Sequence, residues 1–242
     1  MPQTGGPLMT NRPRFVLVHS PLVPSVTMAP LAEVLEQLGF ETVVPELDST
    51  PGHGDLNRRQ AAQVERALRY HGRRKAVVVT HSGAGLLSGL IDPAGAAAHV
   101  MLDAIFPHRP GSRFDFFDDP ATAAEWESLA RRHRGRLPAS FVHKLGNGIT
   151  SSALRAAFEA LARDVPIELY SARAPIRPGW SVAMPGLYLQ WTEPYRHDAQ
   201  RARDAGFDVV HRPASHLELI NDPAGVASQL ADFVQLRQIR AR

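Results

Sequence analysis

The chain has 242 residues, of which 44% are hydrophobic, and its 27 basic and 24 acidic side chains give a formal net charge of +3. This composition is typical of one globular domain with a sizeable core. The chain has no cysteine, which excludes disulfides, thiolate chemistry and cysteine-bound zinc and favours a cytoplasmic location. No run of about 18 apolar residues predicts a membrane span, and residues 1–14 resemble a flexible tail rather than a signal peptide.

Strand and helix patterns alternate in the first part of the chain. Residues 15–19 read as a buried strand, residues 28–38 as a helix that stops at Gly39, and residues 41–45 as a second strand. Asp55 is placed to cap a further helix that begins at Leu56 and ends near residue 71. This alternation is typical of a parallel sheet covered by helices.

The alternation of strand and helix patterns continues after residue 75 and returns near the C-terminus. The predicted strands are residues 76–80, 99–103, 187–192 and 208–212, and the predicted helices follow Ser82, end near Gly206, and span residues 223–235. Six strands with helices on both faces predict an α/β fold with a mostly parallel sheet.

Residues 106–185 interrupt this alternation. They contain two helical patterns, 121–133 and 152–163, and aromatic and proline-rich stretches. An insertion after the fourth strand would lie over the carboxyl ends of the strands, where open α/β sheets bind substrates. We therefore divide the chain into a tail (1–14), a core (15–105 and 186–242) and a cap (106–185).

Thr80-His81-Ser82-Gly83-Ala84 connects a predicted strand to a predicted helix. A serine at the apex of a sharp strand-to-helix turn is the geometry of a nucleophile elbow, and such a strained turn requires small flanking residues. Gly83 and Ala84 meet this need, whereas Thr80 stands where the usual G-x-S-x-G pattern has glycine. Ser82 is therefore a candidate nucleophile.

A serine hydroxyl needs a general base and a group that orients that base. Among the eleven histidines, His216 is the best placed, because it follows the last predicted strand and precedes the closing helix. His211 lies inside that strand and is expected to be structural, and the elbow should point the His81 side chain elsewhere. A helix-capping or surface role is the alternative for His216.

These motifs resemble the α/β-hydrolase superfamily from about Phe15 to Phe233, in the chain order serine, acid, histidine. Because the chain opens almost directly on the strand that ends at His19, it looks most like the compact branch of plant-type esterases and hydroxynitrile lyases. The lyases have a lysine directly after the catalytic histidine. Leu217 at that position speaks against cyanohydrin chemistry.

The resemblance implies that the Gly83 N–H is one donor to the oxyanion. The second donor should lie about two residues beyond His19, where Pro21 has no N–H. Losing one such donor typically costs about 2.7–4 kcal/mol of transition-state stabilisation. We assign the second donor to the Leu22 N–H, with the Ser20 hydroxyl as the alternative; a loop register shifted by one residue would also resolve the conflict.

The third member of the triad is harder to assign. An alignment on Trp191-Thr192 puts the family's usual aspartate position on Tyr195, with Glu193 two residues earlier and Asp198 three later. The family also tolerates an acid at the end of the preceding strand, where Asp103 stands. Glu193 is the preferred acid here and Asp103 the alternative, whereas Asp198 reads as a helix start.

The sequence thus predicts serine-dependent hydrolysis of an ester or thioester through an acyl-enzyme on Ser82, without a metal or organic cofactor. The alternatives are an acyltransferase that uses a carrier-bound thioester in specialised metabolism, and a ligand-binding relative with vestigial catalysis. The expected partner is a small acyl substrate, either free or bound to a carrier protein. No nucleic acid or membrane partner is expected, and basic clusters at 73–75 and 131–136 read as solvated helix ends. The sequence leaves the oligomeric state open.

Overall fold

A computed structural model describes residues 12–50, 55–69 and 74–240. Its main sheet has six parallel strands in the order β2-β1-β3-β4-β7-β8. The strands are β1 (Arg14–Val18), β2 (Thr42–Val43), β3 (Ala76–His81), β4 (Ala96–Leu102), β7 (Gly186–Gln190) and β8 (Asp208–His211). The predicted α/β-hydrolase sheet is confirmed, although β2 is shorter than expected. Most of the predicted tail lies outside the described residues.

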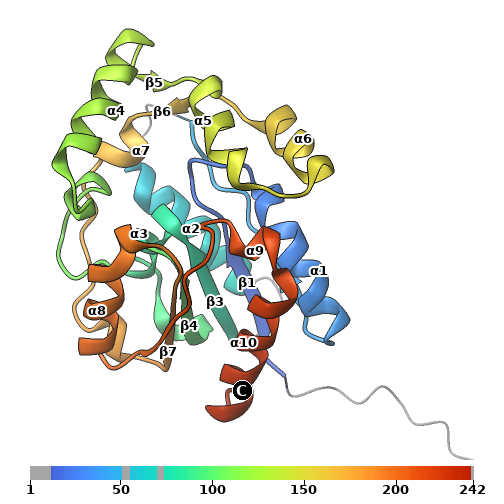
Figure 1. Cartoon of the computed structure of the whole chain (residues 1–242). Coiled ribbons are helices and arrows are strands. Elements are labelled where there is room, and N and C mark those ends of the chain that lie inside the picture. Colours follow the sequence, from blue (N-terminus) through green and yellow to red (C-terminus); the bar gives the residue numbers. More distant parts are fainter. Residues whose placement is uncertain (1–11, 51–54, 70–73, 241–242) are drawn as a thin grey trace, which may run out of the picture.

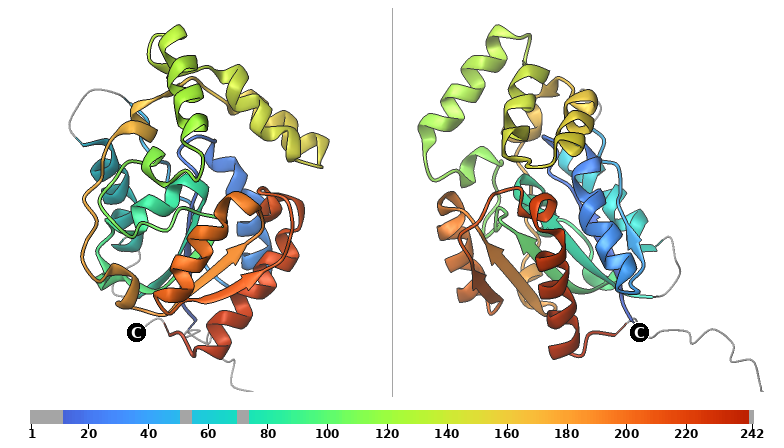
Figure 2. Two further views of the ribbon diagram at one scale, coloured as in Figure 1. Left: turned by 60° about the vertical axis from the view of Figure 1, so that its left-hand side comes forward. Right: turned by 45° about the vertical axis from the view of Figure 1, so that its right-hand side comes forward.

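Helices cover both faces of this sheet (Figures 1 and 2). They are α1 (Ala29–Gln37), α2 (Leu56–Arg69), α3 (Gly85–Ser88), α8 (Arg196–Asp204), α9 (Glu218–Asn221) and α10 (Pro223–Leu236). Asp55 accepts a hydrogen bond from the Arg58 N–H at 3.2 Å, as expected of the cap of α2. The predicted helix after Ser82 is short and ends at Ser88, and the four-residue α9 was not predicted.

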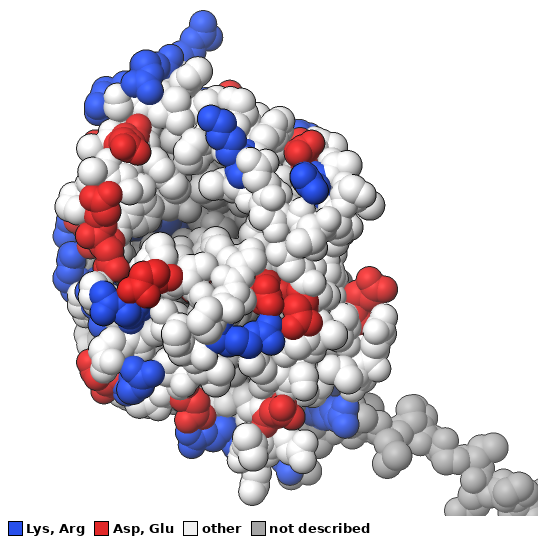
Figure 3. Space-filling model, in the orientation of Figure 1, with Lys and Arg blue, Asp and Glu red and all other residues white. Residues whose placement is uncertain are grey.

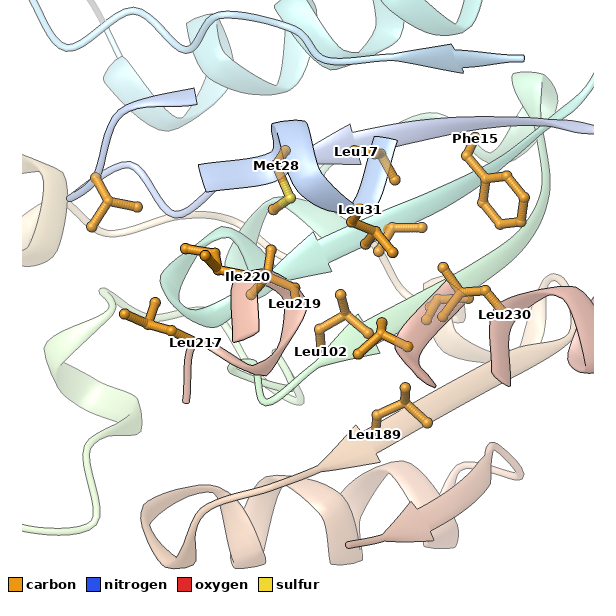
Figure 4. Packing of buried hydrophobic residues seen from close by; sticks show 14 of the residues in the cluster. Phe15, Leu17, Met28, Leu31, Leu102, Leu189, Leu217, Leu219, Ile220 and Leu230 are labelled. Atoms are coloured by element: carbon orange, nitrogen blue, oxygen red, sulfur yellow. The ribbon is translucent and has the colours of Figure 1, made fainter. Parts of the chain in front are cut away.

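Successive side chains of a strand point to opposite faces of the sheet, so the hydrophobic core lies in two layers. Phe15 and Leu17 pack with Leu31 of α1 and Leu230 of α10 on one face (Figure 4). Val16 and its neighbours on the other face pack with α2. Strands buried on both faces explain the continuous apolar runs in the sequence.

Residues 106–185 contain α4 (Pro120–Arg132), α5 (Ala139–Leu145), α6 (Ser152–Leu161) and α7 (Glu168–Ser171), with a small antiparallel pair, β5 (Arg136–Leu137) and β6 (Val165–Pro166). These helices and strands form the upper part of the molecule in Figure 1. The helices α4 and α6 match the two predicted patterns closely, whereas α5, α7 and the strand pair were not predicted. The division into core and cap remains a prediction. No helix in the described part of the chain combines the length and apolar character needed to cross a membrane.

Candidate active site

Ser82 lies directly after β3 in a conformation that few non-glycine residues adopt, with φ of 57°. Its carbonyl accepts a hydrogen bond from the Ile105 N–H at 3.1 Å, which fixes the turn against the chain after β4. Gly85 allows this approach, because a Cβ there would lie 2.1 Å from the Ile105 carbonyl oxygen. The local backbone is therefore the sharp strand-to-helix turn that the sequence predicts.

His216 lies in the loop between β8 and α9, and its side chain is partly exposed. Its Nδ1 is 2.7 Å from Oδ2 of Asp103, which comes from the end of β4. This contact leaves the opposite ring nitrogen, Nε2, as the one that can exchange a proton with a substrate or nucleophile. Ser82, Asp103 and His216 all lie beyond the carboxyl ends of strands.

Asp103 is fully buried and has a positive φ of 43°. Its Oδ1 accepts the N–H groups of Trp191 and Thr192 at 2.9 and 3.0 Å, and its Oδ2 accepts the Thr192 hydroxyl at 2.6 Å in addition to His216. Burial by itself would raise the pKa of Asp103, but the hydrogen bond and charge of His216, with those of Thr192 and Trp191, lower it. The carboxylate is therefore held ionised next to the imidazole.

Glu193, the acid preferred from the sequence, is not brought to His216. Its side chain is 75% exposed and forms an ion pair with Arg196 at 2.6 Å. Glu193 begins a short 3-10 helix, Glu193–Tyr195, which follows β7 and turns its carboxylate to solvent. The alternative, Asp103, has the contact expected of the orienting acid.

Asp198, the third carboxylate considered, lies in the first turn of α8, in agreement with its reading as a helix start, and its side chain is buried. It accepts the Phe106 N–H at 2.9 Å and lies 3.5 Å from a guanidinium nitrogen of Arg201. Burial raises the pKa of Asp198 to about 7. Its contacts fix the start of the cap segment against α8.

Tyr195 contacts both Ser82 and His216, although the sequence predicts no function for it. Its hydroxyl is 3.2 Å from Ser82 Oγ. Its ring is parallel to the His216 imidazole, with 3° between the planes and 5.2 Å between the centroids. The one signal in the sequence was its alignment with the family's usual aspartate position.

His81 also contacts His216, from the residue before Ser82. Its Nε2 donates to the His216 carbonyl oxygen at 2.9 Å, and the two rings lie 4.6 Å apart between centroids. Burial, and then the charge of His216, lower the pKa of His81 to about 3. A neutral imidazole at His81 therefore holds the His216 loop in place.

The loop after β1 contains the two positions assigned to the second oxyanion donor. The Val23 N–H closes a turn on the Ser20 carbonyl at 3.1 Å, and Pro21 has no N–H to offer. The Leu22 N–H is 3.5 Å from the Ser20 hydroxyl oxygen, the outer limit of a hydrogen bond. Gly83 lies close to the Tyr170 hydroxyl, since a Cβ on Gly83 would be 2.9 Å from that oxygen.

A cavity of about 900 Å³ opens at Ser82. Figure 3 shows the surface hollowed below the upper part of the molecule, with largely uncharged side chains around the hollow. Its apolar and aromatic lining comes from both the core and residues 106–185: Leu22, Val23, Ile105, Phe116, Phe117, Trp126, Leu145, Tyr170, Tyr195 and Leu217. The volume suits a small organic molecule.

Charged groups at the cavity are mostly satisfied within the protein. The Asp118 carboxylate lies 2.9 Å from Nδ1 of His197, and Glu193 pairs with Arg196. Asp119 caps α4 by accepting the Ala121 N–H at 2.9 Å. An uncharged ligand fits this lining better than a strongly ionic one.

Searches with the sequence found no matching family model and no matching curated protein. Solved structures match over most of the chain. An extracellular α/β-hydrolase from a Paenibacillus species, described as sharing structural and functional homology with tobacco salicylic acid binding protein 2, has a TM-score of 0.73 at 18% identity, over 91% of this chain and 98% of that one.

Two further structures show the same architecture. A pyrethroid hydrolase from Sphingobium faniae JZ-2 has a TM-score of 0.64 at 20% identity, over 92% of this chain and 97% of that one. The thioesterase domain from the curacin biosynthetic pathway has a TM-score of 0.63 at 14% identity, over 91% of each chain. The chain therefore has the α/β-hydrolase fold, as the sequence predicts.

Proposed function

We propose that this protein is a serine hydrolase that cleaves an uncharged ester or thioester through an acyl-enzyme on Ser82. The observation that carries the proposal is the hydrogen bond of 2.7 Å between His216 and buried Asp103, at a cavity that is also lined by a serine at the apex of a strained turn. An oriented imidazole beside a serine is the arrangement that activates a hydroxyl nucleophile.

In this mechanism Nε2 of His216 accepts the Ser82 proton as Oγ attacks the carbonyl carbon. Asp103 keeps the proton on Nδ1 of His216 and stabilises the imidazolium. The Tyr195 hydroxyl lies 3.2 Å from Oγ. In this mechanism it donates to that oxygen, so that the Ser82 proton is free to pass to His216. His216 then protonates the leaving group, and an activated water releases the acyl group by the reverse sequence.

The aromatic lining of the cavity supports a bulky apolar or aromatic substrate. Ester substrates are favoured by the likeness to a pyrethroid hydrolase, and thioesters by the likeness to a thioesterase domain. Transfer to an acceptor other than water shares the same acyl-enzyme, so it remains a second candidate for that step. The lack of cysteine supports action in the cytoplasm.

The test is a panel of neutral aryl esters and acyl thioesters, assayed with the wild type and with Ser82→Ala. Hydrolysis by the wild type alone supports the proposal. Equal turnover by Ser82→Ala would overturn the serine mechanism. Adding amine, alcohol or thiol acceptors and measuring the ratio of transferred to hydrolysed product separates a hydrolase from a transferase.

A further inference from the structure

One of the two usual sources of oxyanion stabilisation is impaired in this chain. The Gly83 N–H follows the nucleophile directly, but Pro21 removes an N–H from the opposite loop. The Leu22 N–H has the Ser20 hydroxyl as a partner at 3.5 Å. A reaction that develops negative charge at this point requires another donor or another positive charge.

Tyr170 of α7 places a hydroxyl at that point. The oxygen lies so close to Gly83 that a Cβ on this glycine would be 2.9 Å away, and Tyr170, Ser20, Ser82 and Gly83 all line the same cavity. Tyr170 is 3% exposed, so its hydroxyl acts in a largely water-excluded position. Burial raises the pKa of Tyr170, opposed by the charge of Arg113 and a hydrogen bond with Ser20, so the phenol keeps its proton at neutral pH.

Arg113 lies directly behind Gly83 and Tyr170 and is fully buried. Its Nε donates to the Gly83 carbonyl oxygen at 2.7 Å, and its guanidinium carbon is 5.9 Å from the Tyr170 ring centroid. Its other nitrogens donate to neutral oxygens: the side chain of Asn57 at 2.8 Å, the carbonyl of Leu169, and the side chain of Gln60 at 3.3 Å.

Among the described residues, Arg113 has no carboxylate partner in any ion pair or hydrogen bond. Although burial lowers its pKa to about 10, the side chain stays charged at neutral pH. An unpaired cation in a protein interior is costly, typically by several kcal/mol. A negative charge that develops beside Gly83 during a reaction would offset the cost of this unpaired cation.

We infer that the Tyr170 hydroxyl is the second donor to the oxyanion, and that the buried guanidinium of Arg113 supplies the positive charge behind it. This inference rests on the proposed acyl-enzyme mechanism. As Ser82 Oγ forms its bond to the carbonyl carbon, the carbonyl π electrons move to oxygen, where the Gly83 N–H and the Tyr170 O–H donate. The Ser82 proton goes to His216, and Tyr170 keeps its own.

Both residues come from residues 106–185, so this segment would complete the reaction centre as well as cover the cavity. Tyr170 acts as a catalytic residue because it touches the reacting oxygen. Arg113 acts through its charge and through the Gly83 carbonyl, and is a positioning residue.

The test uses an aryl trifluoromethyl ketone, which forms a hemiketal oxyanion with an active serine, and the matching secondary alcohol, which cannot. We expect Tyr170→Phe to raise the inhibition constant of the ketone about 100-fold, in line with the loss of one oxyanion donor, and to change that of the alcohol by less than about threefold. Tyr188→Phe is the matched control, because it removes a buried tyrosine hydroxyl that bonds to Ala104 outside the cavity lining.

Equal ketone affinity in the wild type and Tyr170→Phe would overturn the inference while leaving the serine mechanism intact. Failure of wild-type Ser82 to react with either the ketone or a fluorophosphonate would instead overturn the proposed function, and this inference with it. Arg113→Gln should show the same selective loss of ketone affinity. If Arg113→Gln does not fold, as judged by circular dichroism, the result for Tyr170→Phe decides.

Discussion

The carboxylate of Asp103 and the imidazole of His216 meet at 2.7 Å although 113 residues separate them in the chain. Asp103 stands at the end of β4 and His216 in the loop after β8, on either side of β7 in the sheet. Residues at the carboxyl ends of strands in a parallel sheet share one edge. The sheet order therefore determines which acid reaches the histidine.

The first prediction concerns that acid. Asp103→Asn should lower kcat by about 10³–10⁴-fold, because the amide no longer holds the required tautomer of His216 or stabilises the imidazolium. Glu193→Gln, the control, should change kcat by less than about threefold, since this exposed carboxylate pairs with Arg196. Steady-state kinetics of both variants on one ester checks the ranking. A larger loss in the Glu193 variant would contradict the assignment.

The second prediction separates the two contacts of Tyr195. Tyr195→Phe keeps the stacking on His216 and loses the hydrogen bond to Ser82, and kcat should fall about tenfold or less. Tyr195→Leu also loses the stacking, which is worth about 0.5–1.5 kcal/mol for an aromatic pair, so kcat should fall further in this variant. Single-turnover acylation rates measure both. Identical losses would show that the stacking contributes nothing.

The third prediction concerns the pH dependence of stability. Burial raises the pKa of Asp198 to about 7, whereas an unfolded aspartate has its ordinary pKa of 3.8. The folded chain thus binds a proton that the unfolded chain has released, and its free energy of unfolding should fall as pH rises through this interval. The contribution is fully favourable at and below about pH 4 and is lost above about pH 7.

Asp198→Asn removes this titration and keeps an oxygen acceptor for the Phe106 N–H. Above pH 7 the variant should be more stable than the wild type by roughly 2–4 kcal/mol, and below pH 4 the two should converge. Chemical denaturation at several pH values measures the difference. A constant difference across this range would mean that Asp198 does not titrate as expected.

Much of the fold was accessible from the sequence because strands buried on both faces leave continuous apolar runs. The sharp turn at Ser82 and the loop position of His216 were equally readable. The position of Glu193 was not readable, because an alignment on Trp191-Thr192 cannot show that the chain turns into a short helix and directs this side chain to solvent.

The sequence pattern did not indicate a role for Arg113 or Tyr170 at the oxyanion position. Arg113 flanks one three-residue helix and Tyr170 lies in a four-residue helix, both too short to produce a hydrophobic period. Their importance comes from contacts with Gly83 across 30 and 87 residues of chain, which only the folded structure brings together. Tyr195 acquires its contacts in the same way, from an irregular segment after β7.

Intact-protein mass after incubation with a fluorophosphonate is the most direct measurement of an activated Ser82. The wild type, Ser82→Ala and Asp103→Asn should be compared under identical conditions. The account predicts one adduct on the wild type, none on Ser82→Ala, and much slower labelling of Asp103→Asn. An unlabelled wild type that nevertheless hydrolyses esters, or equal labelling of wild type and Ser82→Ala, would contradict the assignment of Ser82 as the nucleophile.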